Sequence, residues 1–321
     1  MGKGEGEACS PVVVANLNPA IDRVLHASSW RLGETIRVER AVCYAGGKGA
    51  NVTRALKRVG VPVKILNFLS GRTGRLWADL LADEGMEGEH VDVPGGETRI
   101  NVTICHQDRD AKETHFIDTG PVISEDAWRA MQRAIEESLQ QARCLVLTGS
   151  LPPGLPVHAY RDLLELAGKV PVCLDTSGAP LQSAVQKGPW LVKPNRKEAE
   201  GLLGRSLQAK EDLQWAVHCL WDLGVDVAAI SLGDEGAVLG WREEIWWGKI
   251  PVDHVVSTVG CGDAFLAGLI YAATSASTSA LLIQALTFGA LSAMQEAPGA
   301  IAAQDASEDR GIGSPLVERW E

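Results

Sequence analysis

The chain has 321 residues, of which 45% are hydrophobic, and its formal net charge at pH 7 is −11. This length and composition allow a large buried core, arranged as one large domain or two ordinary ones. The acidic balance argues against a surface that binds nucleic acid or an anionic membrane, but it is compatible with a local positive pocket for a phosphorylated small molecule.

Seven cysteines are spread along the chain without a Cys-x-x-Cys motif. Such a set is typical of a reduced cytoplasmic protein and argues against a disulfide framework or a zinc site. The polar first residues do not resemble a signal peptide, so we expect a cytoplasmic protein. Residues 264–295 carry no charge, but a Ser/Thr-rich segment at 274–279 divides them. Each half is shorter than the roughly 20 residues of a membrane span, so we expect two buried helices there.

The first part of the chain alternates between apolar runs and glycine-bounded segments. Val12–Ala15 is a short apolar run typical of a buried strand, and residues 16–19 end it in a turn. The next expected elements are a helix from the glycine-rich stretch 46–49 to Gly60, a strand at 63–69 and a helix at 76–81.

Two segments alternate polar and apolar residues. Residues 30–44 alternate loosely, and residues 98–116 do so more regularly, with a turn at Asp108–Asp110 that folds the second segment into a hairpin. This alternation is typical of strands with one face in water. The two segments together predict a small sheet outside the main body.

From residue 124 onward, helices and strands alternate regularly. The expected helices are 124–142, 158–168, 180–187 and 208–223, and the expected strands are 144–148, 170–174, 190–193 and 227–231. This order predicts a mainly parallel sheet with helices on both faces. Ligands of such folds bind at the carboxyl ends of the strands, where we expect the polar motifs to gather.

The stretch Ser257–Phe265, with the sequence STVGCGDAF, begins an apolar helix with two glycines on either side of Cys261. The backbone N–H groups at a helix start are free to bind an anion, and glycines allow a phosphate to approach them. Asp263 lies at the same helix start. It either accepts a proton from the group that attacks this phosphate or acts as an ordinary helix cap, and the stretch alone favours the cap.

Three candidates in the first hundred residues each allow two interpretations. The stretch GGKGAN at residues 46–51 lacks Walker spacing, so it either presents amides, Lys48 and Asn51 to a ligand or is a tight turn with a solvated lysine. Asp22 either accepts hydrogen bonds from sugar hydroxyls or stabilises a turn. Arg99 either binds a phosphate through two nitrogens or is solvated.

Three further candidates follow strands in the second half. Ser150 lies in the stiff loop GSLPPG at residues 149–154, which needs no function but occupies the expected place of a site. Asn195 and Glu198 either orient a magnesium ion and its waters or form a helix capping box. The small residues of 231–236 either allow a nucleotide to lie close to the backbone or form a hairpin turn.

In order and spacing, these segments resemble the ribokinase/PfkB family of sugar kinases over about residues 11–300. The resemblance rests on the signatures GGKGAN (46–51) and TVGCGDAF (258–265), with GSLPPG (149–154), KPNRKE (193–198) and SLG (231–233) between them. The segments NPAID (18–22) and ETR (97–99) resemble the branch that phosphorylates sugar phosphates, which includes 1-phosphofructokinases and tagatose-6-phosphate kinases.

The resemblance implies a ribokinase-like three-layer α/β/α sandwich with a mainly parallel central sheet. It implies one kinase domain over residues 11–302, with a discontinuous β lid from about 22–44 and 98–118 and flexible tails at 1–10 and 303–321. It further implies ATP and Mg²⁺ as cofactors and a homodimer formed through the lid, with no nucleic-acid or membrane partner. It leaves dependence on a monovalent cation open.

The resemblance also implies a role for each motif residue. Asp263 is the expected base, and the amides of Gly260, Cys261 and Gly262 are expected to hold the transferred phosphoryl group. The sugar phosphate is expected at Asp22, Gly46, Gly47, Lys48, Asn51, Ser150 and, from the lid, Arg99. Nucleotide phosphates and Mg²⁺ are expected at Lys193, Asn195 and Glu198. The rest of the nucleotide is expected at Ser231, Gly233, Gly236, Thr258, Gly260, Gly262 and Gly289.

The implied reaction is ATP-dependent phosphorylation of a ketohexose phosphate, with fructose 1-phosphate first and tagatose 6-phosphate or fructose 6-phosphate next. The alternatives are a free-sugar or nucleoside kinase of the same fold and a catalytically inactive sugar-phosphate sensor. Cys261 stands where the family usually has alanine or serine, so we expect sensitivity to oxidation. The segment 114–121 also departs from the usual lid return, which leaves the exact sugar open.

Overall fold

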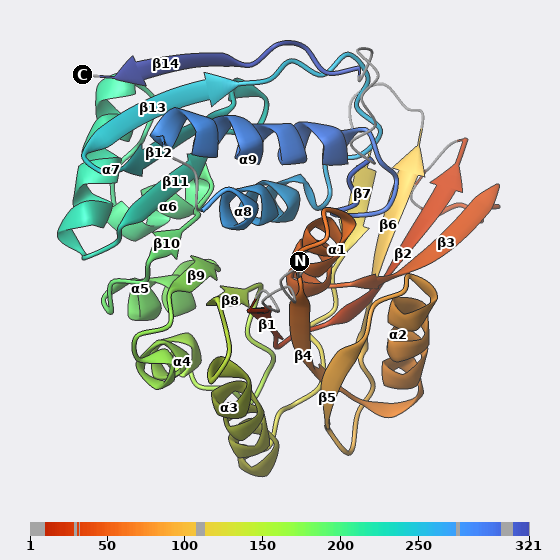
Figure 1. Ribbon diagram of the computed structural model, residues 1–321. Coiled ribbons are helices and arrows are strands. Elements are labelled where there is room, and N and C mark those ends of the chain that lie inside the picture. Colours follow the sequence, from red (N-terminus) through yellow and green to blue (C-terminus); the bar gives the residue numbers. More distant parts are fainter. Residues whose placement is uncertain are drawn as a thin grey trace, which may run out of the picture.

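The computed structural model describes residues 10–28, 31, 33–106, 113–273, 277–302 and 311–320, and arranges them in three layers (Figure 1). In spatial order, the strands of the central sheet are β14 (Leu316–Trp320), β13 (Glu244–Lys249), β12 (Ala237–Trp241), β11 (Val227–Ser231), β10 (Leu191–Val192), β9 (Val172–Asp175), β8 (Cys144–Thr148), β1 (Val12–Asn16), β4 (Val63–Leu69) and β5 (Gly88–Asp92). From β5 to β11 the strands pair in parallel, and β12, β13 and β14 add antiparallel pairs. The expected mainly parallel sheet is confirmed.

Helices cover both faces of this sheet. One face carries α1 (Lys48–Arg58), α2 (Gly71–Asp83), α8 (Cys261–Tyr271) and α9 (Thr278–Ala293). The other carries α3 (Glu125–Leu139), α4 (Ala159–Ala167), α5 (Gly178–Val185), α6 (Arg196–Leu203) and α7 (Lys210–Asp222). Val12 and Val14 of β1 pack in the first core, and Val13 and Ala15 in the second, because successive side chains of a strand point to opposite faces. The expected α/β/α sandwich is therefore confirmed.

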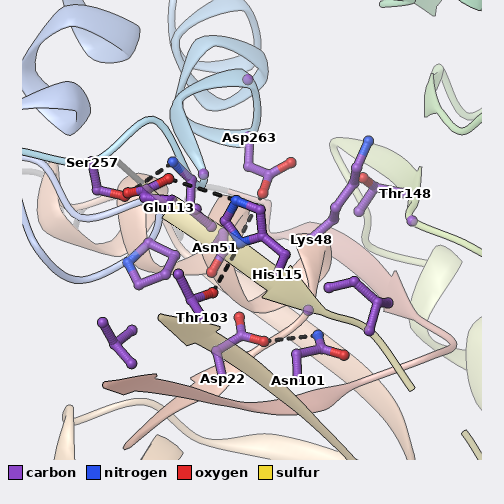
Figure 2. Close-up of a pocket in the computed structure, with 18 of the residues that line it drawn as sticks. Asp22, Lys48, Asn51, Asn101, Thr103, Glu113, His115, Thr148, Ser257 and Asp263 are labelled. Carbon is purple, nitrogen blue, oxygen red and sulfur yellow. Dashed lines mark hydrogen bonds and ion pairs between the residues drawn. The ribbon is translucent and has the colours of Figure 1, made fainter. Parts of the chain in front are cut away.

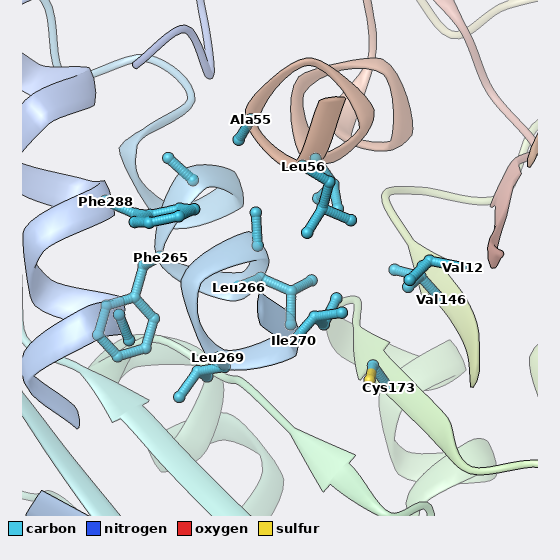
Figure 3. Packing of buried hydrophobic residues seen from close by; sticks show 14 of the residues in the cluster. Val12, Ala55, Leu56, Val146, Cys173, Phe265, Leu266, Leu269, Ile270 and Phe288 are labelled. Atoms are coloured by element: carbon cyan, nitrogen blue, oxygen red, sulfur yellow. The ribbon is translucent and has the colours of Figure 1, made fainter. Parts of the chain in front are cut away.

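Helix α8, which follows the second glycine-rich signature, is buried along most of its length. Every residue from Asp263 to Ile270 is buried, as expected for a helix that is apolar on all sides. In Figure 3, Leu266 and Ile270 lie in one cluster with Leu56 of α1 and the strand residue Val146. This packing holds α8 against the sheet. Among the described residues, no helix combines the length and apolarity of a membrane span.

A smaller sheet stands beside the main body. In spatial order it contains β3 (Arg40–Gly46), β2 (Ala20–Ala27), β6 (Arg99–His106) and β7 (Glu113–Phe116). β2 pairs antiparallel with β3 and parallel with β6, and β6 and β7 form the expected hairpin pair. The predicted turn at Asp108–Asp110 lies outside the described residues. Among the described residues of the alternating segment 30–44, which are 31 and 33–44, only those from Arg40 onward are in a strand.

The C-terminal segment corrects one expectation. Residues 316–320 do not fray but form β14, which pairs antiparallel with β13 from Ile245 opposite Trp320 to Lys249 opposite Leu316. β14 covers the edge of β13, and burial of the Trp320 side chain anchors it. Before β14, the Gly311 backbone oxygen accepts from the Asp253 N–H and the Gly313 N–H donates to the Pro251 oxygen. Residues 1–9, 303–310 and 321 lie outside the described residues.

Candidate active site

A cavity of about 1030 Å³ lies between the carboxyl ends of the parallel strands and one face of the small sheet. The strand ends contribute residues such as Asn16, Thr148 and Lys193. The small sheet contributes alternate residues of two strands, which are Asp22, Val24 and His26 on β2 and Asn101, Thr103 and Cys105 on β6. The N-termini of α1 and α8 complete the wall. The cavity therefore joins both glycine-rich signatures, although more than 200 residues separate them.

The residue that joins the turn to α8 must be glycine. Gly260 is the N-cap of α8 and has φ of 81°, and a Cβ atom there would lie 2.2 Å from the backbone nitrogen of Gly299. In the part of the chain that the structure describes, no protein oxygen accepts a hydrogen bond from the N–H groups of Gly262 and Asp263. Free amides at the positive end of a helix dipole form a site for an anion.

Asp263 lies in the first turn of α8, but the cap is Gly260, so the side chain of Asp263 is available to the cavity (Figure 2). It is only 6% exposed, and the side-chain NH₂ group of Asn51 donates to its Oδ2 at 2.8 Å. Burial raises the pKa of Asp263 to about 6, against the opposing effect of Lys48, Asn51 and Lys193. This carboxyl group is mostly ionised at neutral pH, and its pKa is close to the range that suits a general base.

Asp175 at the end of β9 is a central site residue that the sequence analysis missed. Its side chain is fully buried, and its Oδ1 accepts a hydrogen bond from Lys48 Nζ at 3.2 Å and lies 3.4 Å from Lys193 Nζ. Burial alone would raise the pKa of Asp175, but the two lysines outweigh it and hold this pKa below its usual value. Asp175 therefore holds two ammonium groups near the free amides of α8. The signal available in the sequence was a carboxylate directly after a predicted strand.

The small sheet places two predicted substrate residues at the cavity. The side-chain NH₂ of Asn101 donates to Asp22 Oδ1 at 2.9 Å across paired strands, and burial raises the pKa of Asp22 (Figure 2). Gly47 also lines the cavity. Gly46 does not belong to the lining, because it packs behind Asp22, where a Cβ atom would overlap the carboxyl group.

Arg99 and Ser150 lie at the same part of the cavity wall. The guanidinium of Arg99 donates to the backbone oxygens of Asn18 at 2.8 Å and Asp118 at 2.9 Å. The side-chain NH₂ of Asn18 donates to the hydroxyl of Ser150 at 3.0 Å. These contacts hold a fixed positive charge and a hydroxyl beside each other at the cavity. Arg99, which is expected to reach the substrate phosphate, therefore lies beside Ser150, which is expected near the substrate.

A second cavity of about 560 Å³ adjoins the first, since Ser231, Val255 and Gly262 line both. Its wall contains the other predicted nucleotide residues, namely Gly233, Gly236, Thr258 and Gly289. Apolar side chains, including Phe265 and Leu286, form another part of the wall. Lys193, Asn195 and Gly260 line the larger cavity instead. The predicted nucleotide residues thus occupy two joined spaces, with Gly262 at the junction.

Asn195 and Glu198 form the capping box that was one of the two interpretations. Asn195 Oδ1 accepts from the Glu198 N–H at 2.9 Å, and Glu198 Oε2 accepts from the Asn195 N–H at 2.8 Å. Both residues nevertheless line the larger cavity. The capping box uses the only side-chain oxygen of Asn195 but only Oε2 of Glu198, so Glu198, through Oε1, is the better candidate to face a cation.

The surroundings of Cys261 do not favour the reactivity that the sequence analysis expected. Burial raises the pKa of the Cys261 thiol to about 11, and its Sγ donates to the backbone oxygen of Ser257. The thiolate is the reactive form, and very little of it is present at neutral pH. The structure therefore argues against oxidation sensitivity at this position.

The inner face of the hairpin adds cavity residues that the sequence analysis did not single out. Glu113 and His115 of β7 line the cavity, and His115 Nδ1 lies 3.1 Å from the Thr103 hydroxyl (Figure 2). Alternation in the sequence predicts that these residues share a face. It does not say which face meets the cavity, because that depends on how the small sheet joins the main body.

Comparisons with known proteins agree with this arrangement. The family model for pfkB family carbohydrate kinases matches residues 12–304. A 1-phosphofructokinase from Bacillus subtilis is 33% identical over 261 residues, which are 81% of this chain and 84% of the relative. A 1-phosphofructokinase from Escherichia coli is 34% identical over 265 residues, which are 81% of this chain and 83% of the relative.

Solved structures show the same architecture. Phosphofructokinase-2 from Escherichia coli in complex with potassium has a TM-score of 0.85 and 26% identity, and the match covers 94% of this chain and 97% of that chain. The family match spans both glycine-rich signatures and the strands between them. The chain therefore belongs to the pfkB family of carbohydrate kinases, which confirms the expected class of an ATP-dependent sugar-phosphate kinase.

Proposed function

We propose that this chain transfers the γ-phosphoryl group of ATP to a free hydroxyl of a ketohexose phosphate, with fructose 1-phosphate as the preferred acceptor. The observation that carries the proposal is the position of Asp263 beside the free amides of α8, where the two cavities join. The names of the two bacterial relatives support fructose 1-phosphate over tagatose 6-phosphate and fructose 6-phosphate.

In the proposed reaction, the Asp263 carboxylate accepts the proton of the sugar hydroxyl. The hydroxyl oxygen forms a bond to the γ-phosphorus while the bond between this phosphorus and the β,γ-bridging oxygen breaks, and ADP leaves with the bond electrons. The free amides of Gly262 and Asp263, together with the Gly260 amide and the α8 dipole, stabilise the negative oxygens of the transferred group, whereas the Cys261 N–H donates to the backbone oxygen of Thr258 at 3.4 Å. Lys48 and Lys193, both held by Asp175, add positive charge at the same place.

The sugar phosphate is proposed to bind on the side of the small sheet. Asp22 is an acceptor for sugar hydroxyls, and Asn101 fixes its orientation. Arg99 and Ser150 face the substrate phosphate, since an arginine and a hydroxyl are suited to phosphate oxygens. The small sheet then covers the substrate as a lid. The adenosine part of ATP is assigned to the smaller cavity, whose wall is partly apolar.

Magnesium is proposed to accompany the ATP phosphates near Glu198. Within the described ranges, no three His, Cys, Asp or Glu side chains form a ready metal cluster. This fits Mg²⁺, which keeps most of its waters and takes one or two carboxylates together with substrate phosphates. When bound, Mg²⁺ neutralises phosphate charge, and Glu198 orients its waters. The potassium in the E. coli phosphofructokinase-2 structure makes K⁺ the monovalent ion to test.

One coupled assay of ADP release tests the acceptor. We expect turnover with fructose 1-phosphate to exceed that with tagatose 6-phosphate, fructose 6-phosphate, ribose and adenosine. A preference for ribose or adenosine would instead identify a free-sugar or nucleoside kinase. Binding of fructose 1-phosphate without ADP release from any acceptor would identify an inactive sensor, and either result would contradict the proposal.

We also propose that two chains associate through the outer face of the small sheet. Asp22 and Asn101 face the cavity, so Ile100 next to Asn101 points to the opposite face, where its side chain is 41% exposed. Sedimentation of the wild type and of Ile100→Glu is the test. A dimer that dissociates in the variant supports the proposal, and a wild-type monomer contradicts it.

A further inference from the structure

A buried arginine lies directly behind the pair formed by Asn51 and Asp263. Arg54 is in the second turn of α1 and is only 9% exposed. Because it follows Asn51 by three positions, the two side chains share a helix face. Its Nη1 donates to Asn51 Oδ1 at 2.9 Å, and Asn51 Nδ2 donates to Asp263 Oδ2 at 2.8 Å. A continuous hydrogen-bond chain therefore runs from Arg54 to Asp263.

These hydrogen bonds determine which end of the Asn51 amide faces the Asp263 carboxylate. An asparagine amide has an accepting oxygen and a donating NH₂ group, whereas an arginine only donates. With Arg54 on one side, the Asn51 oxygen must turn toward it, and the NH₂ group then points toward Asp263. The reverse orientation would set two donors against each other and place an oxygen against a carboxylate.

Further contacts keep Arg54 in place. Glu84 at the C-cap of α2 accepts from both Nε and Nη2 of Arg54, the latter at 2.8 Å. Arg54 also donates to the backbone oxygens of Ala45 at 2.7 Å and Pro298 at 2.6 Å. Pro298 lies against the glycine turn that begins α8, since a Cβ atom on Gly260 would lie 3.0 Å from the Pro298 Cα. Arg54 thus contacts both the partner of Asp263 and the segment behind the anion site.

We infer that Arg54 is a positioning residue that orients the Asn51 amide to donate to Asp263, and that Glu84 holds Arg54 in this role. Neither Arg54 nor Glu84 lines the two cavities, so both act through Asn51. The inference rests on the proposed function only in treating Asp263 as the base. The orientation of the Asn51 amide does not depend on the proposed reaction.

The consequence is a change in the titration of Asp263. A hydrogen bond donated to the ionised form favours that form, so loss of the oriented NH₂ group makes Asp263 easier to protonate. The other groups around Asp263 are Lys48 of α1, Asp175 of β9, Lys193 after β10 and Cys261 of α8. The lysines hold the pKa of Asp175 low, and burial raises that of Cys261 to about 11, so neither of these acids titrates near pH 6.

The test follows the Asp263 carboxyl by NMR in the full-length chain with ¹³C-labelled aspartate, using Asp263→Asn to assign the signal. We expect Arg54→Met to raise the titration midpoint by roughly half a unit to one unit. Arg58→Met is the matched control, because Arg58 is exposed on the same helix, and its midpoint should equal that of the wild type. This readout needs no activity, so it can succeed or fail independently of the proposed reaction.

A second background separates orientation from simple loss of positive charge. In Asn51→Ala, the Arg54→Met change should produce no additional shift, because the amide that transmits the effect is absent. Glu84→Gln should give a smaller shift in the same direction, and it decides the question if Arg54→Met does not fold. An unchanged midpoint in the folded variants, or an equal shift with and without Asn51, would overturn the inference. Where the kinase is active, the acid limb of kcat/KM should move with the NMR midpoint.

Discussion

Replacement of Asp263 by asparagine is expected to stabilise the fold at alkaline pH. Burial raises the pKa of this carboxyl from 3.8 to about 6, and this difference corresponds to about 3 kcal/mol at most. Ionisation of Asp263 lowers the free energy of unfolding, because the folded protein binds the proton more tightly than the unfolded chain does. The cost of the ionised form is therefore fully present above about pH 6, decreases as the pH falls toward 3.8, and is absent below that value.

The neutral Asp263→Asn side chain removes this cost and keeps an oxygen that can accept from Asn51. Urea unfolding at pH 8 should show the variant to be more stable than the wild type by about 2 to 3 kcal/mol. At pH 4.5 the difference should shrink to about 1 kcal/mol, because the folded carboxyl is then almost fully protonated while the unfolded one is still mostly ionised. Equal stability at pH 8, or a difference that does not change with pH, would refute the assignment of a destabilised carboxylate.

Three other substitutions test separate parts of the site. Arg99→Ala should raise the KM for the sugar phosphate at least about tenfold, because a lost charged hydrogen bond is worth at least about 1.5 kcal/mol. The KM for ATP should change less than about twofold. Equal changes in the two KM values would show that Arg99 does not face the substrate. Gly260→Ala should lower the urea-unfolding free energy by at least about 2 kcal/mol through positive φ and overlap with Gly299, whereas Gly201→Ala, which has open space in α6, should not destabilise. Mild peroxide should leave the activity of the wild type and of Cys261→Ala equally unaffected; loss of activity in the wild type with resistance confined to this variant would contradict the raised pKa of the thiol.

Local sequence patterns predicted the strands in which nearly every residue is buried. Cys144–Thr148 and Val227–Ser231 are strands with the expected bounds, because a parallel strand covered on both faces is a short apolar run. β14 was not predictable in the same way. Glu318 and Arg319 give it a polar character, and it becomes a strand only through pairing with β13, about 70 residues earlier.

The same distinction separates the site residues. Gly260 and Asp263 were identified because glycine spacing and a following helix are local features of the sequence. Asp175 and Arg54 were missed because their roles come from tertiary contacts. Asp175 meets two lysines from other elements, and Arg54 meets Glu84 and Asn51 inside the fold. A charged residue in a helix gives no sign in the sequence that its side chain is buried.

The proposed role of Asp263 is to take the proton from a ketohexose phosphate as ATP phosphorylates it. This role is tested by kcat with fructose 1-phosphate for the wild type and Asp263→Asn, with ligand binding measured in parallel. We expect ADP and a ketohexose bisphosphate in equal amounts from the wild type, and a kcat lower by roughly 10²- to 10⁴-fold in the variant with binding retained. A variant that turns over at nearly the wild-type rate would contradict it.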